Sequence, residues 1–326
     1  MTRAFRAPGR VNLIGDHTDY NDGFVLPLAI DLECVVRFDS RDDAQVRVKW
    51  HDAEADHFAE AVRRALDERG RPPVGIDAEI SSTVPIGAGL SSSAALEVSL
   101  ALALCAAADF ELPPVELALA CQEAERTARG VPSGIMDQLT AVAGRRGNAL
   151  LIDCRSLDVD PIPIPDGLAV LVVHSGVNRS LEHSTYAERR AECEAIAERL
   201  GLRALRDATP EQVADEPRAR HVVSENARVV AAAQALRSGD TAVLGALLSE
   251  SHASLRDDYE VSTPELDALV RALEDAGALG ARLTGAGFGG CVVALAPRAE
   301  AERILERAAD SHRRWIVNAS DGAGPA

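Results

Sequence analysis

A glycine-rich turn at residues 85–97 has the residue types and spacing of an anion site. Gly87 and Gly89 can adopt backbone conformations closed to residues with a Cβ, and they let a ligand approach the main chain. The serines that follow are favoured at a helix N-cap, where unpaired N–H groups and the helix dipole attract negative charge. This pattern predicts a phosphate site. The alternative is an ordinary loop before a core helix.

Residues 9–23 form a polar stretch whose chemistry suits a ligand with several hydroxyl groups. Between Asp16 and Asp22 the stretch holds three carboxylates, an imidazole and hydroxyl side chains. Carboxylates accept hydroxyl hydrogens, and a site that bonds each hydroxyl rejects analogues lacking one. We therefore expect a loop that binds a polyol. Two alternatives are a polar Asx turn and a metal site made by Asp16, His17 and Asp19.

Two further carboxylates, Glu125 and Asp137, complete the residues that could do chemistry. Asp137 follows Ser133 and Gly134 and falls in the first turn of an expected helix, where the dipole favours the ionised form. Glu125 ends the preceding expected helix. One carboxylate near an acceptor hydroxyl, and another that holds a divalent cation beside a phosphate loop, suffice for phosphoryl transfer. The alternative is an acid that stabilises its own helix and a solvated glutamate.

The composition excludes several classes of protein. A net charge of −17 argues against a nucleic-acid binder or an anionic-membrane binder. Lys49 is the only lysine, is expected on a solvent-facing strand position, and belongs to no P-loop motif. Six scattered cysteines without a C-x-x-C pair indicate a reducing compartment. With no signal-peptide pattern and no membrane-spanning apolar run, we expect a cytoplasmic protein, and no feature points to an obligate protein partner.

The elements that must position these stretches predict an α+β protein of two domains, residues 1–165 and 166–326. The first domain is expected to contain strands at 4–7, 32–38, 45–50, 75–81 and 148–154, helices at 56–69, 92–108 and 113–127, and a short helix after Gly134. Residues 161–165 are rich in proline and are expected to be a linker. The second domain is expected to contain a buried strand at 168–173, helices at 183–200, 218–236, 240–254, 263–275 and 298–313, and strands on either side of the glycine-dense turn at 284–291.

Taken together, these stretches resemble the GHMP kinase superfamily and, within it, the galactokinases. Four motifs in order carry the resemblance, namely residues 10–27 for the galactokinase signature, 85–95 for the ATP loop, 134–138 for the catalytic aspartate and 284–291 for the third motif. Segments at 151–157, 186–194, 224–228 and 250–258 are also similar. The resemblance runs from residue 6 to about 295.

The resemblance implies ATP-dependent phosphorylation of the anomeric hydroxyl of D-galactose on a two-domain fold of mixed sheets layered with helices. The site would lie in the cleft between the domains. By motif position, Asp137 would be the proton acceptor and Arg10 would stabilise the transition state. The residues that would hold the sugar are Asp16, His17, Thr18, Asp19, Gly134 and Tyr186.

The resemblance also implies how ATP and Mg²⁺ would bind. The residues that would wrap the phosphates are Gly87, Ala88, Gly89, Leu90, Ser91, Ser92 and Ser93. Ser93 and Glu125 would hold the metal ion. The residues of the adenine pocket stay open, since Trp50 is the only tryptophan near these motifs.

Two positions depart from the family pattern. Asp16 stands where the signature usually has glutamate, so its carboxylate is one methylene short of the expected sugar hydroxyl, and Ala286 replaces a glycine common in the third motif. Either a water bridges Asp16 to galactose or the preferred sugar differs. Three alternatives remain: a related sugar 1-kinase acting on N-acetylgalactosamine, arabinose or a uronic acid; a non-catalytic sensor of sugar and ATP; and a metal-dependent hydrolase.

Overall fold

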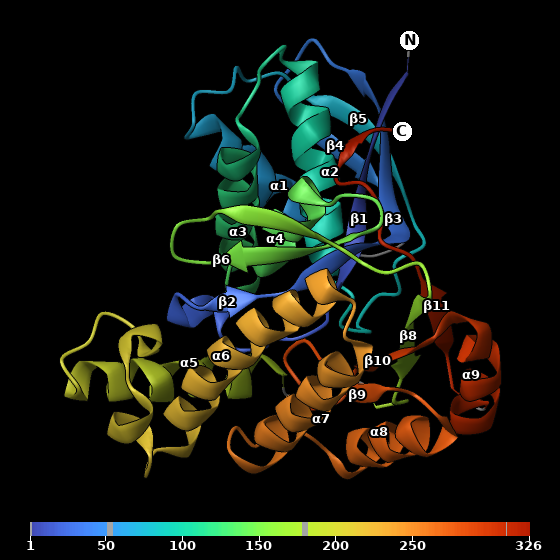
Figure 1. Ribbon diagram of the computed structural model, residues 1–326. Coiled ribbons are helices and arrows are strands. Elements are labelled where there is room, and N and C mark those ends of the chain that lie inside the picture. Colours follow the sequence, from blue (N-terminus) through green and yellow to red (C-terminus); the bar gives the residue numbers. More distant parts are fainter. Residues whose placement is uncertain (1, 51–54, 178–181, 311) are drawn as a thin grey trace.

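The first half of the chain builds a mixed five-stranded sheet (Figure 1). The computed structural model describes residues 2–50, 55–177, 182–310 and 312–326. The strands of this sheet, in order across it, are β12 (Gly324–Pro325), β1 (Arg3–Asn12), β3 (Pro27–Ser40), β5 (Ile76–Ser82) and β4 (Val46–Lys49). The neighbouring strands are antiparallel except β4 and β5, which are parallel.

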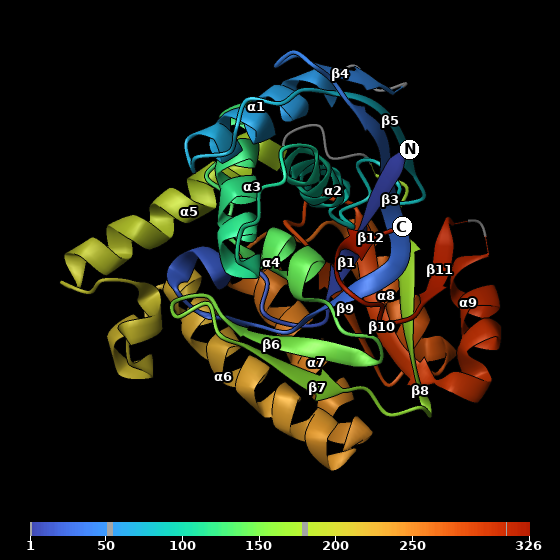
Figure 2. The same ribbon diagram turned by 90° about the horizontal axis from the view of Figure 1, so that it is seen from above.

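Four helices lie on one face of this sheet (Figure 2). They are α1 (Ala55–Asp67), α2 (Ser92–Ala107), α3 (Pro114–Arg129) and α4 (Met136–Ala143). Most residues of α2 are buried, because it is apolar on nearly every side and is enclosed by β1, β3 and the other three helices. The sheet and helices therefore fix the start of α2 directly after the glycine-rich turn.

A small three-stranded sheet contains β2 (Phe24–Val25), β6 (Asn148–Asp153) and β7 (Val159–Pro163). The expectation of a linker at 161–165 is therefore wrong. Pro161 and Pro163 are two residues apart, so both missing N–H groups point to the same side of β7. That side can be the outer edge of the sheet, where proline is tolerated, because β7 is the edge strand.

The second half builds an antiparallel four-stranded sheet with helices packed against it. Its strands, in order, are β11 (Arg314–Val317), β8 (Leu168–His174), β10 (Cys291–Pro297) and β9 (Gly280–Thr284). The helices are α5 (Glu182–Arg199), α6 (Pro217–Ser238), α7 (Thr241–Asp257), α8 (Pro264–Ala276) and α9 (Ala301–Ala309). Single 3₁₀ turns are η1 (Asp19–Asn21), η2 (Leu205–Asp207), η3 (Pro210–Val213) and η4 (Arg298–Glu300). No helix in the described part of the chain has the length and apolarity needed to cross a membrane.

The end of the chain differs from the expected helix at 298–313. A 3₁₀ turn precedes α9, which ends at Ala309, and β11 follows from Arg314. The last residues then return to the first sheet, where β12 pairs with β1 and the two termini lie close together (Figure 1). The division at residues 165 and 166 stays a prediction, and the final segment lies with the first sheet.

Apolar packing is continuous where the two halves meet. Ile14 and Leu28 of the first half belong to one buried cluster with Val229 of α6 and Val293 of β10. The two halves therefore share a core, and a site built from both is held by packed side chains.

Candidate active site

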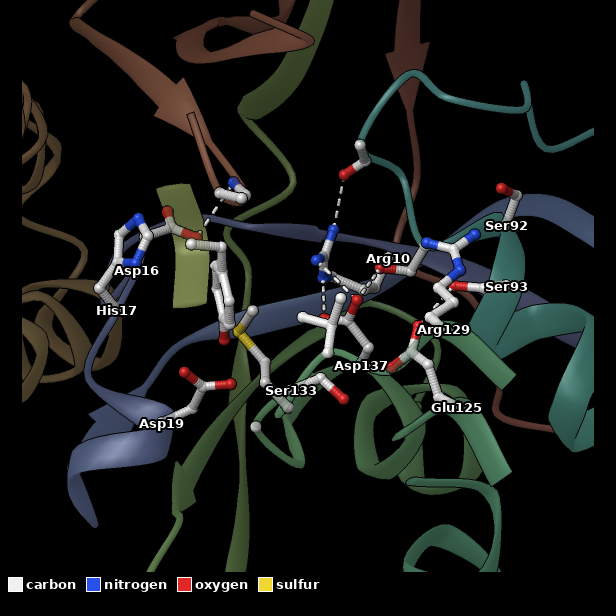
Figure 3. A pocket seen from close by; sticks show the side chains of 18 of the residues that line it. Arg10, Asp16, His17, Asp19, Ser92, Ser93, Glu125, Arg129, Ser133 and Asp137 are labelled. Atoms are coloured by element: carbon white, nitrogen blue, oxygen red, sulfur yellow. Dashed lines mark hydrogen bonds and ion pairs between the residues drawn. The ribbon is translucent and has the colours of Figure 1, made fainter. Parts of the chain in front are cut away.

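Arg10 joins three of the stretches singled out in the sequence. It lies in β1, because the strand continues to Asn12 where we had expected a loop from residue 9. The Nε and Nη2 atoms of Arg10 donate to the two carboxylate oxygens of Asp137 at 2.7 and 2.8 Å, and Nη1 donates to the carbonyl oxygen of Gly89 at 2.7 Å. Figure 3 shows this ion pair in the middle of the site. Arg10 is 5% exposed, so its charge is little screened by water.

Asp137 lies in the first turn of α4, as predicted. In addition to Arg10, the hydroxyl of Ser91 donates to its Oδ2 at 2.5 Å. Ser91 does occupy the N-cap position of α2, but the expected capping bond is absent because the hydroxyl is used by Asp137. The backbone φ of Ser91 is 59°, a left-handed conformation that is uncommon for a residue with a side chain. Strain of this kind is often found at functional sites.

The glycine-rich turn opens onto a cavity. Gly87 (φ 72°) and Gly89 (φ 80°) both have left-handed backbones, which explains why glycine occupies these positions. The turn residues that line the cavity are Gly87, Gly89, Ser91, Ser92 and Ser93. Ala88 and Leu90, also predicted to contact phosphate, have buried side chains in the first core, so only their main chain could do so.

Ser93 and Glu125 form a hydroxyl and carboxylate pair at the start of α2. The Ser93 hydroxyl donates to Glu125 Oε1 at 2.8 Å, and the amide of Gln138 donates to Glu125 Oε2 at 2.9 Å and to Glu97 Oε2 at 3.0 Å. Burial raises the pKa of Glu97 well above its ordinary value, and the nearby charge of Glu125 adds to this effect. The alternative of a solvated Glu125 is wrong, since the residue is 7% exposed. One such carboxylate, with a hydroxyl beside a phosphate loop, fits Mg²⁺, which usually keeps waters and phosphate oxygens as its other ligands.

The polar loop places Asp19 and His17 in the same cavity, with Tyr186 of α5 beside them. Burial raises the pKa of Asp19 to about 7, and the charge of Asp137 adds to this effect. Gly134 lies directly against Asp19, because a Cβ at position 134 would be 1.8 Å from the Asp19 Oδ2 atom. The ring of Tyr186 lies 5.8 Å from the ring of His17, centre to centre. Burial also keeps the pKa of His17 well below its ordinary value, so its ring is neutral.

Thr18 is placed differently from its neighbours. Its hydroxyl donates to the carbonyl oxygens of Gly15 and Phe24 at 2.8 and 2.6 Å, and the residue is fully buried. It closes the loop and does not line the cavity. The structure thus brings Asp16, His17 and Asp19 to the cavity and gives Thr18 a supporting position behind it.

Asp16 is 2% exposed and is bonded from the second half of the chain. The backbone N–H of Gly285 donates to its Oδ1 at 3.0 Å, and Arg282 Nη2 lies 2.6 Å from its Oδ2. Burial raises the pKa of Asp16, and the positive charges of Arg282 and Arg10 oppose that rise. Among the described residues, no group of three or more His, Cys, Asp or Glu is arranged to hold a metal ion. This finding argues against a metal site at Asp16, His17 and Asp19.

Arg282 and Glu225 support the polar loop from behind, and neither was assigned a role in the site from the sequence, although Glu225 lies in the galactokinase-like segment 224–228. Glu225 of α6 accepts the backbone N–H of Gly15 at 2.9 Å, and Arg282 of β9 lies 3.9 Å from the same carboxylate oxygen. Burial acts to raise the pKa of Glu225, but the charge of Arg228 and other nearby groups outweigh it and lower the pKa to about 2. A charged residue in the middle of a buried strand was the available signal for Arg282.

Comparison with known proteins agrees with this geometry. Family models match as "GHMP kinases N terminal domain" at residues 56–145, "GHMP kinases C terminal" at 232–313 and "Galactokinase galactose-binding signature" at 2–38. The chain is 46% identical to a galactokinase of Roseiflexus sp. (strain RS-1), an alignment that covers 98% of this chain and 92% of that relative.

Solved structures give the same result. A galactokinase of Lactococcus lactis, determined in complex with galactose, has 30% sequence identity and a TM-score of 0.94, with 100% of this chain and 95% of that chain covered. A mevalonate kinase of L. major shares the fold at 23% identity and a TM-score of 0.73, with 98% of this chain and 96% of that chain covered. This chain is therefore a member of the galactokinase family of GHMP kinases.

Proposed function

We propose that this protein transfers the terminal phosphoryl group of ATP to the anomeric hydroxyl of D-galactose, giving galactose 1-phosphate and ADP. The observation that carries the proposal is the bonding of Arg10 to both Asp137 and Gly89, which brings a carboxylate to the mouth of the phosphate turn. The sequence identity of 46% to a galactokinase supports the choice of sugar. We also propose a cytoplasmic enzyme, because all six cysteines are buried and none forms a disulfide in the described chain.

Asp137 is the proposed proton acceptor from the sugar hydroxyl. Arg10 and Ser91 already donate to its two oxygens, so part of its hydrogen-bond capacity is in use before the sugar binds, and proton transfer is expected late in the reaction. Phosphoryl transfer passes through a loose transition state, so positioning and charge stabilisation supply most of the acceleration. Arg10 and the N–H groups at the start of α2 would provide that stabilisation.

Ser93 and Glu125 are the proposed ligands of Mg²⁺. When bound, the ion would neutralise negative charge on the transferring phosphoryl group. Gln138 fixes the Glu125 carboxylate, since its amide nitrogen donates to Glu125 and Glu97 together. This hydrogen bond from Gln138 keeps the Glu125 carboxylate directed toward Ser93.

The proposed sugar contacts come from the polar loop and the start of α4. Asp19 has no ion-pair partner in the described chain and offers carboxylate oxygens to sugar hydroxyls, while Tyr186 and His17 present ring surfaces. Asp16 differs, because Arg282 and Gly285 already occupy its oxygens. We therefore assign Asp16 to shaping the sugar site, with any sugar contact made through its remaining hydrogen-bond capacity.

The test is ADP release by the wild type and by Asp137→Asn, with Mg²⁺ or EDTA. The variant keeps the shape of the side chain but cannot accept the hydroxyl proton, so we expect kcat to fall by about 10²–10⁴-fold. The Kd for ATP, measured by calorimetry, should stay within a few-fold of the wild type. Turnover by Asp137→Asn close to that of the wild type would remove Asp137 from the mechanism.

A panel of sugars tests the specificity. We expect kcat/KM to be highest for galactose and lower for its 4-epimer, for N-acetylgalactosamine, for arabinose and for a uronic acid. Equal values for galactose and its 4-epimer would contradict the proposed substrate. Higher values for another member of the panel would reassign the enzyme within the sugar 1-kinases.

A further inference from the structure

Arg129 is the second arginine of the cavity, and it is not engaged as Arg10 is. All the contacts of Arg10 within the site go to Asp137 and Gly89. Arg129 also lines the cavity, but its guanidinium has no hydrogen bond or ion pair with any residue that the structure describes. Its Cζ atom lies 5.3 Å from the centre of the Phe58 ring. Donors of Arg129 are thus available to a ligand.

The negative charges of the cavity require a further cationic donor if ATP is to bind there. Arg10 compensates Asp137, and Arg282 compensates Asp16, whereas Asp19 and Glu125 have no cationic partner among the described side chains. A nucleoside triphosphate brings several further negative charges into this site, and the chain as a whole carries −17. A Mg²⁺ ion at Ser93 and Glu125 would offset only part of this repulsion.

The backbone places Arg129 where phosphates would lie. Arg129 follows Glu125 by four residues on α3, so the two side chains share one helix face. Glu125 accepts a hydrogen bond from Ser93, at the start of α2, and this face of α3 is therefore turned toward the phosphate turn. Figure 3 shows the Arg129 side chain with Ser93 and Glu125 in the site. Phe58 lies under the guanidinium and favours this orientation by a cation–π contact.

We propose that Arg129 binds a terminal (β or γ) phosphate of ATP across from the glycine-rich turn, a role that rests on the proposed function for the identity of the nucleotide. The turn supplies main-chain N–H groups on one side of the phosphates, and Arg129 supplies a planar, charged donor on the other. A purely structural role would be that of a cation in the last turn of α3, which favours the helix dipole. The two roles differ in what substitution does to nucleotide affinity.

The test is calorimetric titration of Arg129→Gln with ATP, ADP and adenosine, in Mg²⁺ and without sugar. We expect the Kd for ATP to rise by about tenfold, since a hydrogen bond to a charged group is lost, and the Kd for adenosine to be unchanged. Arg129→Lys should be intermediate, because lysine offers a point charge without a planar fork. The matched control is Arg64→Gln, which removes an equal charge from an exposed pair with Glu68 on α1.

Each possible result of these titrations supports or overturns the proposal. An unchanged Kd for ATP in Arg129→Gln, whether or not the melting temperature falls, would overturn the proposal. An equal loss of affinity for adenosine would also overturn the proposal, because the guanidinium would then contact the nucleoside and not a phosphate. An equal rise in the Kd for ATP in Arg64→Gln would show that the effect comes from net charge and not from a contact with a phosphate, and would also overturn the proposal. If the wild type binds ATP but phosphorylates no sugar, the proposed function fails while the role of Arg129 in ATP binding stands.

Discussion

Two aspartates in the cavity, Asp137 and Asp19, have different neighbours. Asp137 receives hydrogen bonds from Arg10 and Ser91 on its two carboxylate oxygens. Asp19 is half-buried near Asp137 and has no ion-pair partner among the described residues, and desolvation raises its pKa to about 7. At neutral pH the Asp19 carboxyl therefore exists partly in the protonated form.

This difference predicts a pH dependence of sugar binding. Below pH about 7 Asp19 is mostly protonated and accepts hydroxyl hydrogens poorly, so the Kd for galactose should rise by up to tenfold for one pH unit below the pKa. Because the pKa in the folded protein is raised above 3.8, this residue binds more protons when folded, and its contribution to stability falls as pH rises from about 4 to about 7. Calorimetry of galactose between pH about 6 and 8 measures the effect.

The control is Asp19→Asn, which should bind galactose weakly and with little pH dependence over the same range. Proton release should accompany galactose binding by the wild type below pH about 7, and buffers of different ionisation enthalpy detect it. A wild-type Kd that is constant from pH about 6 to 8 would refute the assignment of this titration to Asp19.

The sequence identified the residues of the cavity better than the residues behind it. Arg10, Glu125 and Asp137 lie in or beside glycine-rich motifs with strong local patterns, and the structure brings them together. Arg282 lies just before the glycine-dense turn and Glu225 within the segment 224–228, but their partners at residues 12–16 are more than two hundred residues away. Pairing over such a distance depends on tertiary packing, which local sequence does not contain.

At the level of elements, α6 and β9 hold the polar loop in position. Glu225 accepts the N–H of Gly15, and the Arg282 guanidinium donates to the carbonyl oxygen of Leu13 at 3.2 Å. Arg282 and Glu225 are fully buried, so their charges depend on each other and on Asp16. The polar loop is therefore positioned from the second half of the chain.

Arg282→Met should show this dependence. The change leaves the buried Asp16 carboxylate without its ion-pair partner, while Glu225 keeps its ion pair with Arg228. Removing one partner of a buried ion pair costs about 3–5 kcal/mol of stability. We expect a lower melting temperature and a raised KM for galactose, with the KM for ATP less affected because the phosphate turn does not contact Arg282.

Arg282→Lys is the second variant, in case Arg282→Met does not fold. Lysine retains the charge but not the fork that reaches Asp16 and the Leu13 carbonyl together, so stability should largely return while the KM for galactose stays raised. Galactose and ATP constants that change equally in both variants would contradict a role limited to the polar loop.

The sequence predicted helices well and strands that contain proline or glycine poorly. The proline at the start of α3 and the apolar periodicity of α1 placed both helices within a few residues. In β1, Pro8 and Gly9 looked like breakers, yet the strand continues through them with a shift of register between Pro8 and Arg10. A Cβ at Gly9 would be 2.7 Å from the carbonyl oxygen of Leu90, so the glycine lets the phosphate turn pack against β1.

At the scale of the whole molecule, the final segment connects the second half of the chain to the first. Asn318 donates through its backbone N–H and its side chain to the two carboxylate oxygens of Asp31, and the N–H of Gly322 donates to the carbonyl oxygen of Gly144 just beyond α4. None of these residues lines the cavity. The contacts made by the final segment are thus separate from the cavity, whereas Arg282 and Gly285 join the halves at the cavity itself.

Deletion of residues 318–326 should therefore lower stability without abolishing catalysis. Several hydrogen bonds are lost, each worth about 1 kcal/mol net, together with the pairing of β12 and β1. We expect the melting temperature, measured by intrinsic fluorescence, to fall by several degrees.

Asp137 is fixed by Arg10 and Ser91 at the opposite end of α4 from the final segment. The kcat of the deletion variant, measured well below its melting temperature, should therefore stay within a few-fold of the wild type. Asp31→Asn removes only part of this attachment and should give a smaller fall in the same direction. A large loss of kcat in a deletion variant that is still folded would mean that the final segment sets the position of α4, and hence of Asp137, from behind.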